Sequence, residues 1–196
     1  MTLHLLMVSA LLLACEVAPA QPSPAPMATA TPNDAARGFY AVYLAWRNWG
    51  VPPAASRNPF TPVVSAGLGG DLAAANLAAE RGAPGGVPPG WPGDLFTSLA
   101  EGAQRADVGA CTRSGESARC DVTLTVRDPA SGIDRRWHDT VLVRRERGSW
   151  VVDDVVYGGR WPGANSGTLR ANLKALAAPP TPPPPPSPRP PLPPSR

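Results

Sequence analysis

Two aspartates lie within strand-like apolar patterns and are the side chains best suited to acid–base chemistry. Asp139 follows Trp137 in one pattern, and Asp154 lies in the pattern that starts at Trp150. A carboxylate in a desolvated cleft can act as a general acid or base once its pKa is displaced. Asp139 and Asp154 are therefore the catalytic candidates if this protein is an enzyme.

The hairpin that joins their strands has two possible registers. In one register Asp139 lies directly opposite Asp154, and two facing carboxylates would form a site. In the other, a left-handed Gly148 shifts the pairing by one residue and separates the two acids. Arg135 and Arg136 lie nearby in the sequence. We expect ordinary ion pairs with these arginines to account for the acids.

The other residue types offer no further catalytic or metal site. His138 alternates out of phase with Trp137 and Asp139, which predicts a surface position. The only other histidine is His4, and the sequence contains no Cys-x-x-Cys motif. We therefore expect neither a metal site nor a cofactor.

Cys111 and Cys120 predict a structural disulfide. The eight residues between them read Thr-Arg-Ser-Gly-Glu-Ser-Ala-Arg, and a two-residue turn with Gly115 first matches a type II′ hairpin. That turn places Cys111 opposite Cys120 at a non-hydrogen-bonded pair, where Cα atoms are about 4.5 Å apart and within disulfide range. In an exported chain we expect such a pair to be oxidised.

The first residues have the pattern of an export signal. Residues 3–14 are an apolar stretch of signal-peptide length, followed by small residues. Two cleavage sites remain open. Leu-Leu-Ala before Cys15 resembles the bacterial lipobox, which would make Cys15 a lipid anchor, whereas cleavage after Ala20 would leave no lipid. We expect a signal peptide of residues 1–14 or 1–20, a tether over residues 15–32, and a periplasmic or secreted location.

Composition bounds the folded part of the chain. Of the 27 prolines, 5 lie in residues 19–32 and 12 in residues 179–196, which leaves residues 33–178 as a single domain. The net charge is only +3, without a long run of like charge, so nucleic acid is not an expected partner. We expect the polyproline tail to be a disordered spacer, although its end, Pro191-Leu192-Pro193-Pro194-Ser195-Arg196, fits the pattern of SH3 ligands.

Helical periodicity predicts two helices before the sheet. Asn33 can cap the first, whose apolar residues recur at spacings of three and four and end near Gly50. Thr61 can cap the second, which runs to Gly82. The apolar stripe of the first helix is a core face, or a ligand wall if the fold leaves a cavity beneath it. It consists of Phe39, Val42, Tyr43, Trp46 and Trp49.

Beyond a Gly- and Pro-rich loop over residues 82–93, the apolar period changes to two. This alternation predicts four antiparallel strands in sequence order. A closing helix capped by Ser166 or Thr168 follows. Two helices, a curved four-stranded meander and a closing helix together predict an α+β fold.

Five stretches of the chain carry a resemblance to a known family. They are Phe39-Tyr40-x-x-Tyr43, Gly93-Asp94-x-Phe96-Thr97, Trp137-x-Asp139, Trp150-Val151-Val152-Asp153-Asp154-Val155-x-Tyr157 and Trp161-x-x-Ala164-Asn165-x-Gly167-Thr168-Leu169. Over about residues 37–176 the chain resembles the nuclear-transport-factor-2-like superfamily, and within it the bacterial envelope group called domain of unknown function 3828. The resemblance implies a cone-shaped fold and an exported module without established catalytic residues.

The sequence leaves two functions open. The first is a non-catalytic binding or interaction module of the bacterial cell envelope, whose partner is an unknown small molecule, peptide or envelope protein. Contact with the membrane would occur only through lipid on Cys15. The second follows from the resemblance, because isomerases and dehydratases of this superfamily carry out acid–base chemistry inside the cone. The residues expected to line the cone are Phe39, Tyr43, Trp46, Trp137 and Asp139.

Overall fold

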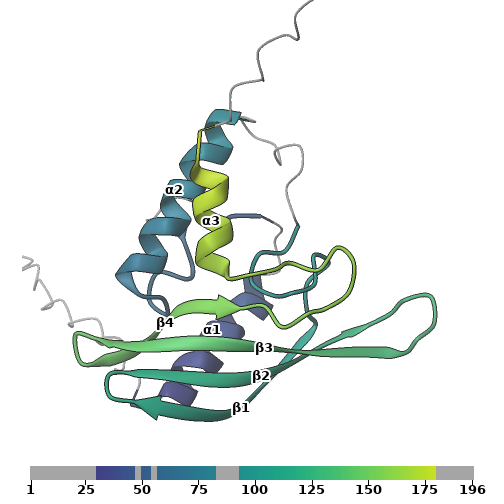
Figure 1. Ribbon diagram of the computed structural model, residues 1–196, viewed down its shortest axis with the longest axis horizontal. Helices are drawn as coiled ribbons and strands as arrows, with labels where there is room; N and C mark the ends of the chain where they lie inside the picture. Colours follow the sequence, from purple (N-terminus) through teal and green to yellow (C-terminus); the bar gives the residue numbers. More distant parts are fainter. Residues whose placement is uncertain (1–29, 47–49, 54–56, 83–92, 180–196) are drawn as a thin grey trace, which may run out of the picture.

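The computed structural model describes residues 30–46, 50–53, 57–82 and 93–179 and confirms the predicted α+β class (Figure 1). Cys15, Trp49, most of the loop of residues 82–93 and the polyproline tail lie outside these residues. The helices and strands are α1 Pro32–Trp46, α2 Ala66–Gly82, β1 Arg105–Ser114, β2 Ser117–Arg127, β3 Asp134–Glu146, β4 Ser149–Val156 and α3 Leu169–Ala177.

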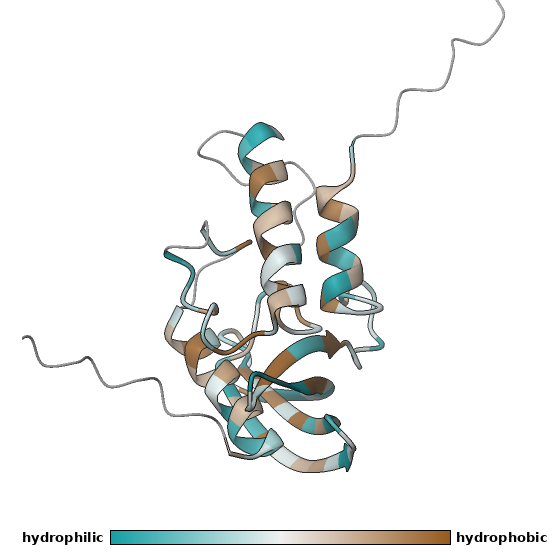
Figure 2. Ribbon diagram, turned by 90° about the vertical axis from the view of Figure 1, so that its left-hand side faces the viewer, coloured by the Kyte–Doolittle hydropathy of each residue, from teal (hydrophilic) through white to brown (hydrophobic). Residues whose placement is uncertain are grey.

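The four strands form one antiparallel sheet in the order β1-β2-β3-β4. Buried and exposed residues alternate along β2 and through the middle of β3, as expected for a sheet with one face on the core and one face in water. Helix α1 crosses the inner face, whereas α2 and α3 lie side by side beyond the β4 edge (Figures 1 and 2). The core therefore lies between α1 and the sheet.

Helix α1 begins two residues earlier than predicted. Thr31, not Asn33, caps it, because the Thr31 hydroxyl oxygen accepts a hydrogen bond from the Asp34 amide at 3.1 Å. Pro32 then takes the first helical position, where its missing N–H leaves no hydrogen bond unmade. The side chain of Asn33 is free to contact the sheet instead.

Helix α2 begins later than predicted, whereas the cap of α3 is confirmed. The Ser65 hydroxyl oxygen accepts a hydrogen bond from the Leu68 amide at 3.0 Å, so Ser65 and not Thr61 is the cap of α2. The Thr168 hydroxyl oxygen accepts from the Ala171 amide at 3.2 Å. Helix α2 is therefore capped by Ser65, the residue directly before the helical apolar pattern.

Aromatic rings fill the space beneath α1. Phe60 stacks on Phe96 with ring centroids 4.4 Å apart, and Phe39 lies 5.5 Å from the first ring and 5.8 Å from the second. Trp46 packs edge-on against both Phe60 and Phe96. All three phenylalanines are fully buried, so this cluster is a packed core of large apolar side chains.

The first hairpin forms as predicted. Ser114 pairs with Ser117 across the turn, and the disulfide joins Cys111 to Cys120 with their Cα atoms 4.0 Å apart. Gly115 has a φ of 59°, which a type II′ turn requires at its first central residue. A bulge between Val108 and Cys111, which the sequence did not predict, shifts the pairing in the rest of β1.

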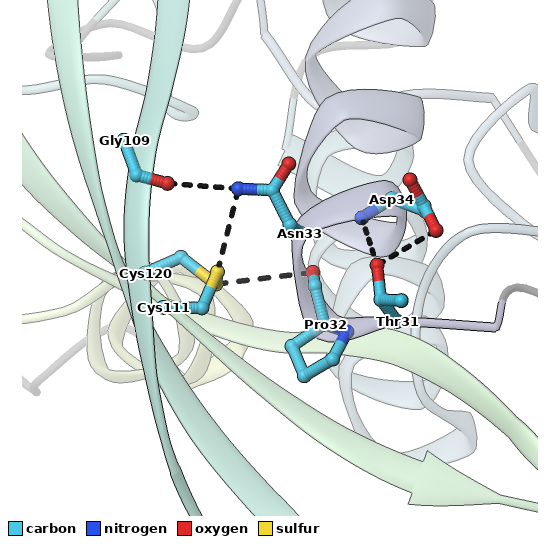
Figure 3. Close-up of a disulfide and its surroundings, with 7 residues drawn as sticks. All are labelled: Thr31, Pro32, Asn33, Asp34, Gly109, Cys111 and Cys120. Carbon is cyan, nitrogen blue, oxygen red and sulfur yellow. Dashed lines mark hydrogen bonds between the residues drawn. A yellow bond between two sulfur atoms is a disulfide. The ribbon is translucent and has the colours of Figure 1, made fainter.

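The disulfide lies beside the first turn of α1 (Figure 3). The Asn33 side-chain amide donates to the Gly109 carbonyl oxygen at 2.8 Å and lies 3.9 Å from the Cys111 sulfur. The Cys120 sulfur lies 3.8 Å from the Pro32 carbonyl oxygen. The bond therefore fixes the part of the sheet on which α1 starts.

The β3–β4 hairpin takes neither predicted register. Arg147 and Gly148 have φ values of 51° and 85° and form a two-residue turn, as in type I′ hairpins. A bulge between Leu142 and Val143 then shifts the pairing again, so that Asp154 pairs with Leu142. Asp139 and Asp154 are thus not opposite each other, and the facing carboxylates do not form.

Replacing both cysteines by alanine should lower the free energy of unfolding by about 2 to 3 kcal/mol, because the bond restricts the unfolded chain. Urea denaturation measures this change. Reduced wild-type protein is the control and should match the double variant, and both thiols should resist alkylation before reduction. Equal stability of the oxidised and reduced proteins would contradict the prediction.

Candidate functional site

The loop of residues 93–104 leads into β1 and contains one of the stretches that carried the family resemblance. All residues from 93 to 99 are buried. Gly93 has a φ of 79°, and a side chain there would collide with the Ala100 carbonyl oxygen. The Asp94 amide donates to that same oxygen at 2.8 Å. A buried loop of this kind must satisfy its polar groups without a helix or a sheet ladder.

Asp139 on β3 anchors this loop to the sheet. Its side chain accepts hydrogen bonds from the Ser98 amide at 2.8 Å, from the Ser98 hydroxyl, from the Trp137 indole at 3.3 Å and from the Gly158 amide at 2.8 Å. Four donors therefore engage a carboxylate in a residue that is only 2% exposed. This number of donors satisfies a buried acid without a cation.

The expected ion pair between Asp139 and Arg135 or Arg136 is wrong. Both arginines are exposed on β3, whereas Asp139 points into the core. Strand alternation places Arg136 on the opposite face, and the donors named above already surround Asp139. The prediction that His138 lies at the surface is confirmed, and its Nδ1 is 3.2 Å from the Thr123 hydroxyl oxygen.

Asp94 holds the same loop to α1. One carboxylate oxygen accepts from the Phe96 amide at 3.0 Å, and the other accepts from the Thr97 hydroxyl at 2.6 Å and the Tyr43 hydroxyl at 3.0 Å. The Tyr43 oxygen in turn accepts from the Ala103 amide at 2.7 Å. Burial raises the pKa of Asp94 to about 6, although these hydrogen bonds oppose the shift.

Asn165, which precedes α3, completes the network from a third side. Its side-chain amide donates to the carbonyl oxygens of Asp94 and Thr97 at 2.8 and 2.7 Å. Its backbone amide donates to the Ser98 carbonyl oxygen at 2.9 Å. The three buried polar residues Asp94, Asp139 and Asn165 thus hold one loop in place.

Tyr40 differs from its polar neighbours. Its hydroxyl is buried and has no hydrogen-bond partner among the described residues. Burial, reinforced by the charge of Asp139, raises the pKa of Tyr40 well above its ordinary value. The hydroxyl therefore stays neutral and is poorly suited to act as a base.

Asp154 belongs to a separate group of charges where β4 meets α2 and α3. Its carboxylate accepts from the Arg170 backbone amide at 3.0 Å. The Arg170 guanidinium binds Asp71 at 2.7 Å and Asp153 at 3.3 Å, and the pKa of Arg170 is raised chiefly by its hydrogen bond to Asp71. This group joins three elements and does not include Asp139.

The five residues predicted to line the cone are packed against other side chains. Phe39, Tyr43, Trp137 and Asp139 are buried, and Trp46 is half-buried. None of the five lines any of the three hollows on the described part of the chain that we consider further. In the described interior these residues therefore have side-chain partners.

The largest of the three hollows lies on the outer face of the sheet, away from α1, near the ends of the two hairpins. Its volume is about 490 Å³. Arg119 on β2 and Arg144 on β3 lie beside the half-buried Leu142. Arg119 makes no ion pair within the described ranges, whereas Arg144 contacts Glu146 at 3.4 Å. We call this hollow the outer-face groove.

Hydroxyl groups border the outer-face groove near the turn between β1 and β2. Thr112, Ser114 and Ser117 supply them, and all three residues are exposed. Asp153 borders the opposite end, but Arg170 and the Ser65 hydroxyl, at 2.5 Å, already bind its carboxylate. The groove therefore combines cations and hydroxyl donors with an apolar contact, a combination suited to an amphipathic anion.

Comparisons with protein-family models, curated proteins and solved structures found no match. Among the described helices, none combines the length and hydropathy that crossing a membrane requires. The described residues also contain no cluster of three or more histidines, cysteines or acids that could hold a metal ion.

Sequence reasoning missed the roles of Ser98 and Asn165 and the outer-face groove. A signal for the buried loop was present, because several polar residues interrupt an apolar run between Gly93 and Gly102. Apolar and polar residues that alternate with neither helical nor strand period indicate a buried loop with internal hydrogen bonds. The groove left no such signal, since its residues lie on different strands.

The Asp139→Asn variant should lose about 2 to 4 kcal/mol of stability, because an amide cannot accept all four hydrogen bonds and brings two donors of its own. Urea denaturation tests this expectation. Asp121→Asn, on the exposed face of β2, is the matched control and should change stability by less than about 0.5 kcal/mol. An Asp139→Asn protein as stable as the control would show that the network is not an anchor.

Stability should fall as the pH rises through the titration of Asp94. Its pKa is raised from 3.8 to about 6, so the folded protein binds this proton more tightly than the unfolded chain does. The stabilisation is complete below about pH 4 and is lost as the pH rises through about 6, by up to about 3 kcal/mol. Urea denaturation between about pH 4 and 7 measures the drop.

Asp94→Asn carries no titrating proton and should lack this drop. The Asn amide can donate to the Thr97 hydroxyl oxygen, while the Thr97 hydroxyl donates to the Leu99 carbonyl oxygen, 3.1 Å away. The variant should therefore fold. Asp121→Asn should keep the wild-type pH dependence. If the Asp94→Asn protein lost as much stability over this pH range as the wild type, the loss would come from other titrating groups.

Proposed function

We propose that this protein is an exported, non-catalytic binding module of the bacterial cell envelope and that its ligand site is the outer-face groove. The observation that carries the proposal is the filled interior. Phe39, Phe60 and Phe96 occupy the space beneath α1, and the inward acids are held by loop donors. Binding is therefore expected on the surface.

Export is supported by the disulfide and by the sequence of the first residues. Disulfides persist in oxidising compartments and are rare in the cytosol, and the Cys111–Cys120 bond lies within the folded domain. The apolar stretch of residues 3–14 has the length of a signal peptide. Lipidation of Cys15 would hold the module at a membrane surface through its tether.

Membership of the nuclear-transport-factor-2-like superfamily is part of the proposal. It is supported by the order of the elements, with two helices before a four-stranded meander and one after it. The quoted motif residues Asp94, Asp139 and Asn165 also meet in one network, which gives them a shared structural reason to occur together. This reason concerns the loop and not catalysis.

The ligand class follows from the groove. A guanidinium without an ion pair among the described residues, such as that of Arg119, gains most from a carboxylate, sulfate or phosphate group. The Leu142 side chain lies between Arg119 and Arg144 and favours an apolar portion next to the charge. We therefore assign the groove to a small amphipathic anion, such as a lipid-like acid or an acidic peptide end.

The fluorescent dye anilinonaphthalene sulfonate is a suitable probe, since it joins apolar rings to one sulfonate. Titration of the mature protein, followed by amide chemical shifts, should perturb Arg119, Leu142 and Arg144. Arg119→Glu should weaken dye binding about tenfold, because it replaces a charge-assisted contact by repulsion. Arg136→Glu, an exposed charge on the same face but outside the groove, should leave binding unchanged.

The alternative function is a small isomerase or dehydratase that uses Asp139 or Asp154 as its acid or base. Shifts centred on Phe39, Tyr43 and Asp139, with no effect of Arg119→Glu, would favour that alternative over the groove. Equal losses from Arg119→Glu and Arg136→Glu would mean that only general surface charge attracts the dye, and would overturn the assignment.

A further inference from the structure

The two edges of the sheet differ in how far other backbone segments cover them. At the β4 edge, the Ser65 amide donates to the Val152 carbonyl oxygen at 2.7 Å, and the Val152 amide donates to the Val63 carbonyl oxygen at 3.0 Å. Gly167 covers the end of the same edge by accepting from the Tyr157 amide at 3.1 Å. Strand β1 forms the other edge, and no backbone segment in the described part of the chain pairs with its outer side.

The first half of β1 is regular and, among the described residues, uncovered. The bulge between Val108 and Cys111 interrupts the regular strand. At the bulge, the Asn33 side-chain amide donates a hydrogen bond to the Gly109 carbonyl oxygen (Figure 3). Bulges and covering groups are the usual ways in which proteins block an exposed edge. Residues 105–108 have neither protection.

The backbone groups of Ala106 face the open side. The Gln104 amide donates to the Thr125 carbonyl oxygen at 2.8 Å, so the peptide groups of Thr125 point towards β1. Arg105, which is opposite Thr125, is therefore a hydrogen-bonded position. Such positions alternate along an antiparallel pair, so the next residue, Ala106, directs its N–H and C=O away from β2.

The residues before and after Ala106 carry opposite charges, so this segment is complementary to a second copy of itself. Arg105 and Asp107 lie on the outer face, are 56% and 58% exposed, and form an ion pair of 2.9 Å. If two copies pair antiparallel with Ala106 opposite Ala106, each Arg105 faces Asp107 of the other copy. Opposite charges at facing positions stabilise a strand pair.

A groove between α1 and β1 provides room for the second copy. Its volume is about 350 Å³, and Ala41, Leu44, Ala106 and Val108 supply its apolar lining. Facing residues of paired strands project to the same side of a sheet. Ala106 and Val108 of the second copy would therefore project towards the apolar part of this groove, which Arg37, Tyr40 and Asp107 also line.

We propose that two copies of this chain associate edge to edge through residues 105–108 of β1, centred on Ala106, so that the two sheets become one. The contact is isologous, since the same segment serves on both copies and the pair closes on itself. The interface is distinct from the outer-face groove, so either proposal can fail without the other.

Charge reversal tests the pairing. The protein should dimerise reversibly in sedimentation equilibrium at concentrations up to about 1 mM, the range of weak, small interfaces. Arg105→Asp and Asp107→Arg should each abolish dimerisation, because like charges then face each other. An equimolar mixture of the two variants should recover it, since every facing pair is again opposite. Failure of the mixture to associate would overturn the proposal.

A cysteine scan tests the register in a Cys15→Ser background. Cα atoms at a hydrogen-bonded pair lie about 5.5 Å apart, within disulfide range, so Ala106→Cys should give a covalent dimer on mild oxidation. Val108→Cys should not, because it would face Gln104. Ala106→Pro, which removes only an outward N–H, should keep the fold by circular dichroism and lose the dimer. Crosslinking through position 108 instead, or a dimeric Ala106→Pro protein, would overturn the model.

Discussion

The interaction on which the rest of this structure depends is the capture of a buried loop by one aspartate. Residues 93–99 pass through the interior without a helix or sheet ladder, so side chains must satisfy their peptide groups. Asp139 does this from the sheet, and Asn165 from the segment before α3. With the loop fixed, Phe96 lies against Phe60, and the aromatic core can close beneath α1.

Features set by neighbouring residues could be predicted from the sequence. Alternation and turn signals identified the four strands, and the turn at Gly115 fixed the pairing of Cys111 with Cys120. The second hairpin failed because its register depends on Arg147, a non-glycine residue with positive φ, which sequence patterns rarely reveal. The predicted caps of α1 and α2 were wrong for a related reason, since several capping residues compete near each start and only packing selects among them.

The loop network lay beyond this kind of prediction because it joins distant residues. Ser98 and Asp139 are 41 residues apart, and Asn165 lies 71 residues after Asp94. No periodicity links such positions, so Asp139 could be identified as an unusual inward acid but not given its partners. Ion pairing with adjacent arginines was the local explanation, and strand alternation explains why it is wrong: Arg136 points to the other face.

The count of donors around an inward acid separates a structural role from a catalytic one. A general base needs an oxygen that can accept the substrate's proton, and this requires a free lone pair facing a cavity. Asp139 is engaged by donors from Ser98, Trp137 and Gly158 on both of its oxygens. Opening it to a substrate would release the loop and leave several buried N–H groups unpaired, each at a cost of about 1 to 3 kcal/mol. Catalysis at Asp139 would therefore require the loop that closes the core to open, and this cost supports the proposal that ligands bind at the surface.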